Sequence, residues 1–134
     1  PIMEARRKAE ELGVDAEFIQ MDALKLPSLE RQFDSVIDCG LFHVLSDADR
    51  RAYVAALTHV TRVGGRLFLM CFSDEEPGGP GPRRIRQDEI RAAFADGWTV
   101  ESIRPSHFEP NPQSKETFVD GGPRAWFAGI RRGS

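Results

Sequence analysis

The residues that determine the fold class are FDSVIDCGLFHV at positions 33–44 and RLFLMCF at positions 66–72. Both segments are mostly apolar, and neither keeps the alternation of a strand with one side in solvent. Such runs are typical of strands buried on both faces of a parallel sheet. Between them lies an apolar stripe at helical spacing, ended by Gly64-Gly65 and made of Tyr53, Ala56, Leu57 and Val60. The order strand, helix, strand predicts a right-handed crossover between two parallel strands.

The N-terminal region adds one helix and one short strand to this unit. One face of the helix is formed by Ile2, Ala5, Ala9 and Leu12. Gly13 supplies the stop, and the apolar run at residues 18–21 predicts a strand that ends at Asp22. The sequence begins at Pro1 with a helical pattern at once, without Met and without the features of a signal peptide. We therefore expect residues 1–134 to be a fragment that lacks the N-terminal part of its domain.

The C-terminal half completes an α/β pattern. A loop rich in Gly and Pro at residues 73–84 precedes a helix at 87–95, and a strand follows at 98–108. After a second polar loop, residues 125–131 form a last strand. Two strands joined only by a loop are normally antiparallel, because a parallel pair needs a crossover. The whole order predicts a Rossmann-like, mostly parallel sheet with helices on both faces and an antiparallel last strand.

Composition excludes several classes of protein. The chain is 40% hydrophobic and 29% charged, which is typical of a globular domain and not of a disordered chain. No apolar run approaches the ~20 residues of a membrane helix, and the net charge of -3 argues against nucleic acid as the main partner. Cys39 and Cys71 show neither a disulfide framework nor a zinc spacing, which favours the reducing cytoplasm. The acidic residues also lack a ligand spacing, so no metal is expected.

The predicted architecture places the ligand site before any motif is considered. In open α/β sheets, ligands bind at the carboxyl ends of the strands. The residues expected at that edge are Asp22-Ala23, residues 39–43, residues 73–84 and the segment that follows Phe108. Asp38 lies one residue inside its strand end, and its side chain could point toward the site or away from it.

The order of these segments resembles the class I S-adenosylmethionine-dependent methyltransferases. The resemblance rests on Asp22-Ala23 after a strand, FDSVIDCGLFHVL, a helix, RVGGRLFLMCF, and a closing antiparallel strand, and it spans nearly all of residues 1–134. Gly64-Gly65 is similar to the family's PGG turn, with Val63 in the position of the proline. The segments GGPGPRR and AWFAGIRR resemble the small-molecule branch that includes thiopurine, thiol and halide methyltransferases.

The resemblance implies S-adenosylmethionine as the cofactor and assigns residues to it. In the family, the pair at Asp22 and Ala23 faces the adenine, where the carboxylate accepts from the amine and the next backbone N–H donates to the ring. Backbone at Cys39 and Gly40 would contact the methionine and sulfonium part, since a glycine allows close backbone approach. Leu41 would pack over the adenine or line the substrate pocket, although simple core packing is the alternative.

The resemblance also gives candidates for the substrate side. Phe42 would line the pocket unless it packs in the core, and His107 lies near a strand end on the ligand side. His43 is the candidate catalytic residue, because an unperturbed imidazole pKa near ~6.5 allows it to accept a proton at neutral pH. The alternative is that His43 only forms hydrogen bonds with the backbone. Arg83-Arg84 could bind an anionic substrate, or they could be solvated loop charges.

The function implied is methyl transfer to a small molecule through a sulfur, oxygen or nitrogen nucleophile. A nicotinamide-dependent oxidoreductase on a related doubly wound sheet and a non-catalytic partner-binding domain are the alternatives. The family's Gly-rich loop and its ribose-binding acidic residue do not occur in residues 1–134, which correspond to the C-terminal two-thirds of a single methyltransferase domain. We therefore expect this fragment to be inactive by itself and to self-associate through open strand edges.

Overall fold

The computed structural model describes residues 1–79, 81–109 and 121–134. Within them, one sheet contains four strands, in the order β1-β2-β4-β3. The strands are β1 (Phe33–Cys39), β2 (Thr61–Phe72), β3 (Trp98–His107) and β4 (Arg124–Arg132). β1 pairs parallel with β2, whereas β4 is antiparallel to both β2 and β3. The predicted mixed α/β sheet and its antiparallel last strand are thus confirmed.

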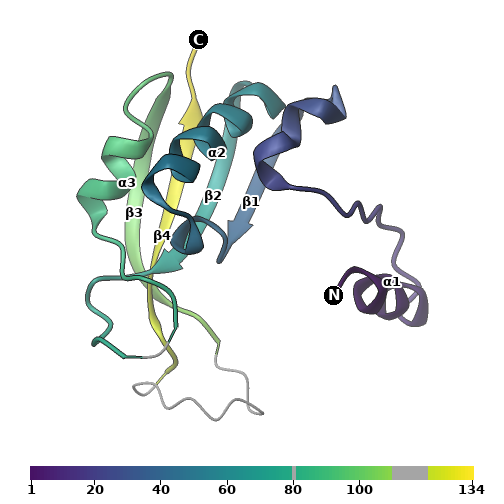
Figure 1. Ribbon diagram of the computed structural model, residues 1–134, viewed down its shortest axis with the longest axis horizontal. Helices are drawn as coiled ribbons and strands as arrows, with labels where there is room; N and C mark the ends of the chain where they lie inside the picture. The colour runs from purple at the N-terminus through teal and green to yellow at the C-terminus, as the bar shows by residue number, and fades with distance from the viewer. Residues whose placement is uncertain (80, 110–120) are drawn as a thin grey trace.

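The strand register brings the carboxyl ends of three strands to one side of the sheet. Cys39 at the end of β1 pairs with Met70 near the end of β2. Ala125 at the start of β4 pairs with Phe72 on one side and with Ser106 of β3 on the other. The carboxyl ends of β1, β2 and β3 and the start of β4 therefore share one side, which we call the carboxyl edge (Figure 1).

The two helices α2 (Asp47–Val60) and α3 (Gln87–Ala93) cover one face of the sheet (Figure 1). Ser46 caps α2, because its hydroxyl accepts a hydrogen bond from the Asp49 N–H at 3.1 Å. The predicted buried stripe of α2 is confirmed at Tyr53, Ala56, Leu57 and Val60. The sheet contributes the other half of the core, chiefly Leu67, Leu69, Cys71, Trp126, Ala128 and Ile130. Both partners are apolar on the facing sides, so their burial stabilises the layers.

The connection from α2 to β2 differs from the prediction. The helix ends at Val60 and β2 begins at Thr61, so the glycine pair lies inside the strand and not between helix and strand. A register shift in the β1–β2 pairing marks a bulge there. Gly65 is required at the bulge, because a Cβ would lie 2.8 Å from the carbonyl oxygens of Arg62 and Asp34.

The N-terminal segment differs more strongly. Residues 18–21 pair with no strand in the part of the chain that the structure describes, so the predicted strand is wrong there. An apolar run needs a neighbouring strand to complete its hydrogen bonds. The helix α1 (Ile2–Glu11) stands apart from the sheet and buries no residue (Figure 1). Among the described residues, α2 and α3 cover one face and no helix covers the other, so the predicted helices on both faces are not found there (Figure 1).

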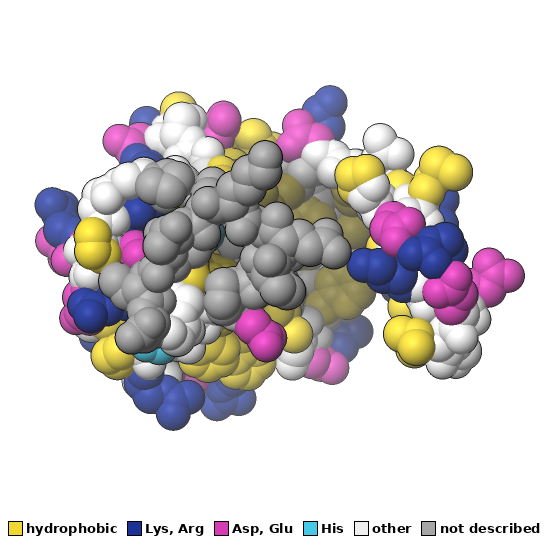
Figure 2. Space-filling view, turned by 90° about the horizontal axis from the view of Figure 1, so that it is seen from below, with side chains coloured by type: hydrophobic (Ala, Val, Ile, Leu, Met, Phe, Trp, Pro, Cys, Tyr) yellow, Lys and Arg dark blue, Asp and Glu magenta, His cyan; other side chains and the backbone are white. Residues whose placement is uncertain are grey.

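Because α1 stands apart from the sheet, hydrophobic side chains are exposed both beside α1 and on β1. Leu12 is 78% exposed next to α1, and Ile37 on β1 is also 78% exposed. In the view from below, hydrophobic side chains are visible on the part of the body that faces α1 (Figure 2). Exposed apolar surface of this kind favours association with other molecules. Within the described residues, no helix has the length and apolar character needed to cross a bilayer.

Candidate functional site at the carboxyl edge

A short turn at the end of β1 forms the centre of the carboxyl edge. Gly40 follows β1 with a φ of 96°, a backbone conformation that favours glycine. Its N–H donates to the Met70 carbonyl at 3.0 Å, which continues the β1–β2 pairing by one step. The 3-10 helix η2 (Phe42–Val44) then turns the chain toward α2. Cys39 is exposed and Gly40 is half-buried, so backbone is accessible at this turn.

Asp38 points into the protein and away from solvent, which answers the question left open by the sequence. The residue is 4% exposed. Its Oδ1 accepts from the Leu41 N–H at 2.8 Å, and its Oδ2 accepts from the Phe42 N–H at 3.2 Å and from the Tyr53 hydroxyl at 2.8 Å. Burial raises the pKa of Tyr53, and the negative charge of Asp38 and this hydrogen bond raise it further. The carboxylate therefore holds the turn and does not face a ligand.

His43 holds the same turn from its other side. The residue is 6% exposed, and its Nδ1 accepts from the Phe72 N–H at 2.8 Å. An amide can only donate, so the ring hydrogen is on Nε2 in the neutral form. Burial lowers the pKa of His43, while the negative charge of Asp38 and a hydrogen bond with the Gly40 backbone act in the opposite direction. This geometry favours the alternative in which His43 bonds the backbone, because the Nδ1 lone pair is already used.

Three aromatic rings meet beside this turn: His43 lies in η2, Phe72 ends β2, and Phe108 follows β3. The rings of His43 and Phe72 lie 5.2 Å apart in an edge-to-face arrangement, and Phe108 lies 5.7 Å from His43 and 5.4 Å from Phe72. We call these three residues the aromatic cluster. The Arg84 guanidinium lies 5.0 Å from the centre of the Phe72 ring. The sequence did not predict the cluster, although all three residues lie at or shortly after the carboxyl ends of strands that the architecture brings together.

The loop after β2 is bonded to β4, although several of its described residues are exposed. Glu76 is 5% exposed, and its Oε2 accepts from the Arg124 N–H at 2.7 Å. The Trp126 indole N–H donates to the Ile85 carbonyl at 2.9 Å. The Arg84 guanidinium donates to backbone carbonyls of this loop, so a solvated loop charge does not describe it. The Glu76 bond therefore anchors this part of the loop beside the start of β4.

The other predicted cofactor residues are divided between the edge and a separate segment. Cys39, Gly40 and Leu41 lie together in the turn, and Leu41 packs partly against the core. Asp22 lies before the 3-10 helix η1 (Ala23–Leu29), where its Oδ1 accepts from the Leu24 N–H at 2.9 Å. Ala23 packs partly against the core. The exposed Asp22 carboxylate has further acceptor capacity, because an ionised carboxylate has about four acceptor positions.

The remaining predicted substrate residues have different environments. Phe42 is 0% exposed, and its ring lies 6.1 Å from that of Phe94 in the core. This position favours the core-packing alternative for Phe42. His107 ends β3 at the carboxyl edge, is exposed, and has its Nδ1 3.1 Å from the Gly122 carbonyl oxygen. It lies on the expected side for a substrate contact.

Polar groups remain open to solvent at Asp22 and at the turn. An exposed carboxylate at Asp22 suits an exocyclic amine, and the accessible backbone at Cys39 and Gly40 suits a group that approaches the chain closely. Among the described residues, no group of three His, Cys, Asp or Glu side chains could hold a metal ion.

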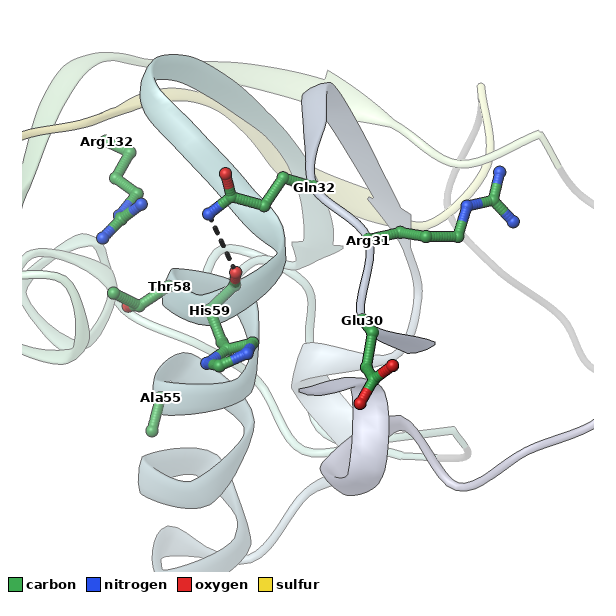
Figure 3. A pocket seen from close by; sticks show the side chains of 7 residues that line it. All are labelled: Glu30, Arg31, Gln32, Ala55, Thr58, His59 and Arg132. Carbon is green, nitrogen blue, oxygen red and sulfur yellow. Dashed lines mark hydrogen bonds between the residues drawn. The ribbon is translucent and has the colours of Figure 1, made fainter. Parts of the chain in front are cut away.

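A cavity lies at the opposite end of the sheet. Its volume is about 490 Å³, and its lining includes Gln32 before β1, His59 near the end of α2, and Arg132 at the end of β4 (Figure 3). The Gln32 amide donates to the His59 carbonyl at 3.3 Å across it. The strand directions place this cavity away from the carboxyl edge, so it is not part of the candidate site.

Comparison with known sequences gives a family match and several partial relatives. A family model described as a methyltransferase domain matches residues 1–65. An uncharacterized methyltransferase of Schizosaccharomyces pombe is 37% identical over 57 residues, which cover 42% of this chain and 39% of that protein. The 2-heptyl-1-hydroxyquinolin-4(1H)-one methyltransferase of Mycobacteroides abscessus is 26% identical over 121 residues, covering 88% of this chain and 52% of the relative. The chain thus spans about half the length of these relatives, or less.

Comparison with solved structures covers almost the whole chain. A structure described as "Conversion of a Disulfide Bond into a Thioacetal Group during Echinomycin Biosynthesis" has 34% identity and a TM-score of 0.82, and the match covers 98% of this chain and 62% of that one. The Burkholderia thailandensis 1,6-didemethyltoxoflavin-N1-methyltransferase, with bound S-adenosylhomocysteine, has 19% identity and a TM-score of 0.68. This match covers 98% of this chain and 57% of that one. The second likeness shows the fold alone.

Proposed function

We propose that this chain, for which the comparisons support a class I S-adenosylmethionine-dependent methyltransferase, belongs to a single domain that methylates a small molecule. The observation that carries the proposal is the turn at Cys39, Gly40 and Leu41. It presents backbone at the carboxyl edge and is held from inside by Asp38 and His43. Ligands of open α/β sheets bind at this edge, where a rigid turn can position them.

The cofactor contacts divide between two segments of the chain. The Asp22 carboxylate accepts from the adenine amine, and the Ala23 N–H donates to the ring. Backbone at Cys39 and Gly40 contacts the methionine part, and the Leu41 side chain packs against the nucleoside. The exposure of Asp22 and the partial exposure of Gly40 support these roles, because both residues are accessible from solvent.

The acceptor binds at the same edge, beside His107 and the exposed part of Phe108. Its reacting atom is a sulfur, oxygen or nitrogen, in a molecule like those of the small-molecule branch of thiopurine, thiol and halide methyltransferases. The named substrates of the Mycobacteroides and Burkholderia relatives are heterocyclic molecules, which supports a small acceptor. The loop after β2, which Glu76 joins to the start of β4, lies beside this edge.

The bound cofactor supplies a methyl group on a positively charged sulfur, which is already activated toward a nucleophile. Alignment of the acceptor is then the main task of the protein. We assign His43 to this task through its hold on the turn. A catalytic role as the proton acceptor would require release of its Nδ1 from the Phe72 N–H.

Calorimetry on the protein from its complete reading frame tests the proposal. We expect binding of S-adenosylhomocysteine and none of a nicotinamide dinucleotide. Asp22→Ala should weaken the binding by about 1–3 kcal/mol, the range for a hydrogen bond to a charged group. Asp34→Ala is the matched control, because Asp34 is another exposed carboxylate, bonded to Arg62 at the start of β1. Binding of the dinucleotide alone would favour an oxidoreductase, and binding of neither would favour a non-catalytic domain.

A further inference from the structure

Asp38 and Tyr53 are buried polar residues to which no contact with cofactor or acceptor has been assigned. Each is 4% exposed, and the Tyr53 hydroxyl donates to Asp38 Oδ2 at 2.8 Å. Asp38 belongs to β1 and Tyr53 to α2, so this bond joins the strand to the helix that covers it. Burial of a carboxylate is unfavourable unless hydrogen bonds compensate for the lost water. Two apolar side chains at these positions would avoid the cost of burying a carboxylate. Packing alone therefore does not explain Asp38 and Tyr53.

The reason lies in the two backbone N–H groups that the same carboxylate holds. The first residues of η2 have no capping side chain of their own. Asp38, which precedes Leu41 by three residues and Phe42 by four, accepts from both N–H groups. It thereby fixes the peptide planes that follow Gly40. Tyr53 donates a third hydrogen bond to the Asp38 carboxylate. Burial raises the pKa of Tyr53, so its hydroxyl stays protonated and can donate.

We propose that Asp38 and Tyr53 form a positioning pair that holds the backbone of residues 40–42 in the conformation that binds the cofactor. This inference rests on the proposed function, since it assigns the pair to the same site. Neither side chain touches a ligand. The pair acts through the turn, opposite the hydrogen bond between His43 and Phe72. With the Asp38 and His43 hydrogen bonds in place, the turn is preorganised. Cofactor binding then needs no further ordering of the turn.

The first test compares two variants that each remove one hydroxyl group from α2. Tyr53→Phe removes the bond to Asp38. Thr58→Val is the matched control, because the Thr58 hydroxyl accepts from the Trp98 indole at 2.9 Å, near the other end of the helix. In the protein from its complete reading frame, Tyr53→Phe should weaken S-adenosylhomocysteine binding about tenfold, the loss of one hydrogen bond to a charged group. Thr58→Val should leave the affinity within about twofold even if it lowers the melting temperature.

The second test needs no cofactor. Amide hydrogen exchange in Asp38→Asn should accelerate at Leu41 and Phe42 by about tenfold or more, because an amide side chain accepts more weakly than a carboxylate. Amides in the middle of α2 should keep the protection that they have in the wild-type protein. Unchanged exchange at Leu41 and Phe42 would overturn the inference.

The outcomes separate this inference from the proposed function. If the wild-type protein binds S-adenosylhomocysteine and the two hydroxyl variants bind it equally well, the positioning pair is refuted and the methyltransferase proposal stands. If the wild-type protein does not bind the ligand, the proposed function fails and the cofactor role of the pair fails with it. A selective loss in Tyr53→Phe together with faster exchange in Asp38→Asn supports both.

Discussion

Replacement of His43 by Asn is predicted to make protein stability less dependent on pH below neutrality. The imidazole is buried, which lowers its pKa, and the positive charge of Arg84 adds to this effect against the opposing influence of Asp38 and the Gly40 backbone. An Asn amide oxygen can replace Nδ1 as the acceptor for the Phe72 N–H, but the amide does not titrate. The variant therefore keeps the hydrogen bond and removes the proton-binding group.

The sign follows from the two states of the chain. In the unfolded chain, His43 takes up a proton below pH ~6.5, whereas the buried ring resists protonation until a lower pH. The free energy of unfolding therefore falls as the pH falls through this window, and the fall ends below the folded-state pKa. Uptake of one proton changes the free energy of unfolding by at most about 1.4 kcal/mol per pH unit. For a chain of this size, 1 kcal/mol corresponds to about 4 °C in melting temperature.

Urea unfolding of both proteins from about pH 7.5 to about pH 5.5 measures this difference. His59 and His107 are present in both proteins, so their effects cancel in the comparison. The wild-type protein should lose stability across this range relative to His43→Asn. His43→Ala should be less stable at every pH by about 1–3 kcal/mol, because the Phe72 N–H loses its partner. Parallel pH profiles for the wild-type protein and His43→Asn would refute the argument.

Three further predictions concern the bulge, the thiols and the open surface. Gly65→Ala should destabilise the protein by about 2 kcal/mol or more in thermal unfolding, since a Cβ meets two carbonyl oxygens at 2.8 Å; an unchanged melting temperature would contradict this. In the native protein, iodoacetamide should modify exposed Cys39 but not Cys71, whose buried thiol has its pKa raised to about 12; equal labelling in mass spectra would argue against that burial. Residues 1–134 alone should self-associate in sedimentation velocity, because apolar side chains such as Ile37 are exposed. They should bind no stoichiometric S-adenosylhomocysteine, because the family's Gly-rich loop and ribose-binding acidic residue are not among them; a stable monomer or tight binding would be the opposite result.

Apolar patterning predicted the central βαβ unit because its apolar residues gather in three segments, and only the middle one has helical spacing. That middle segment is the stripe on α2, and the strand at residues 66–72 lies within β2. The prediction that β1 is buried on both faces is wrong, since Ile37 is 78% exposed. The same reasoning failed at residues 18–21, since an apolar run becomes a strand only beside another strand. It also missed the start of β2, where a bulge accommodates the glycine pair that predicted a helix end.

The polar side chains of the site were harder to predict than its place. The carboxyl edge follows from the order of the elements alone, so residues 39–43 could be located there. The orientation of Asp38 depends on donors three, four and fifteen residues further along the chain. The partner of His43 lies twenty-nine residues away. Periodicity indicates which residues are buried, but such pairings form only in the folded chain.

The place of β4 in the middle of the sheet has a consequence for synthesis on the ribosome. β3 leaves the ribosome before β4, yet it pairs with β4 and is separated from β2 by it. The strand at residues 98–107 therefore has no partner in this sheet until residues 124–132 have been translated. Until then a growing chain can close only the unit of β1, α2 and β2. Folding of the sheet should thus end in a late step, and a stop codon before residue 124 would leave both β2 and β3 with an open edge.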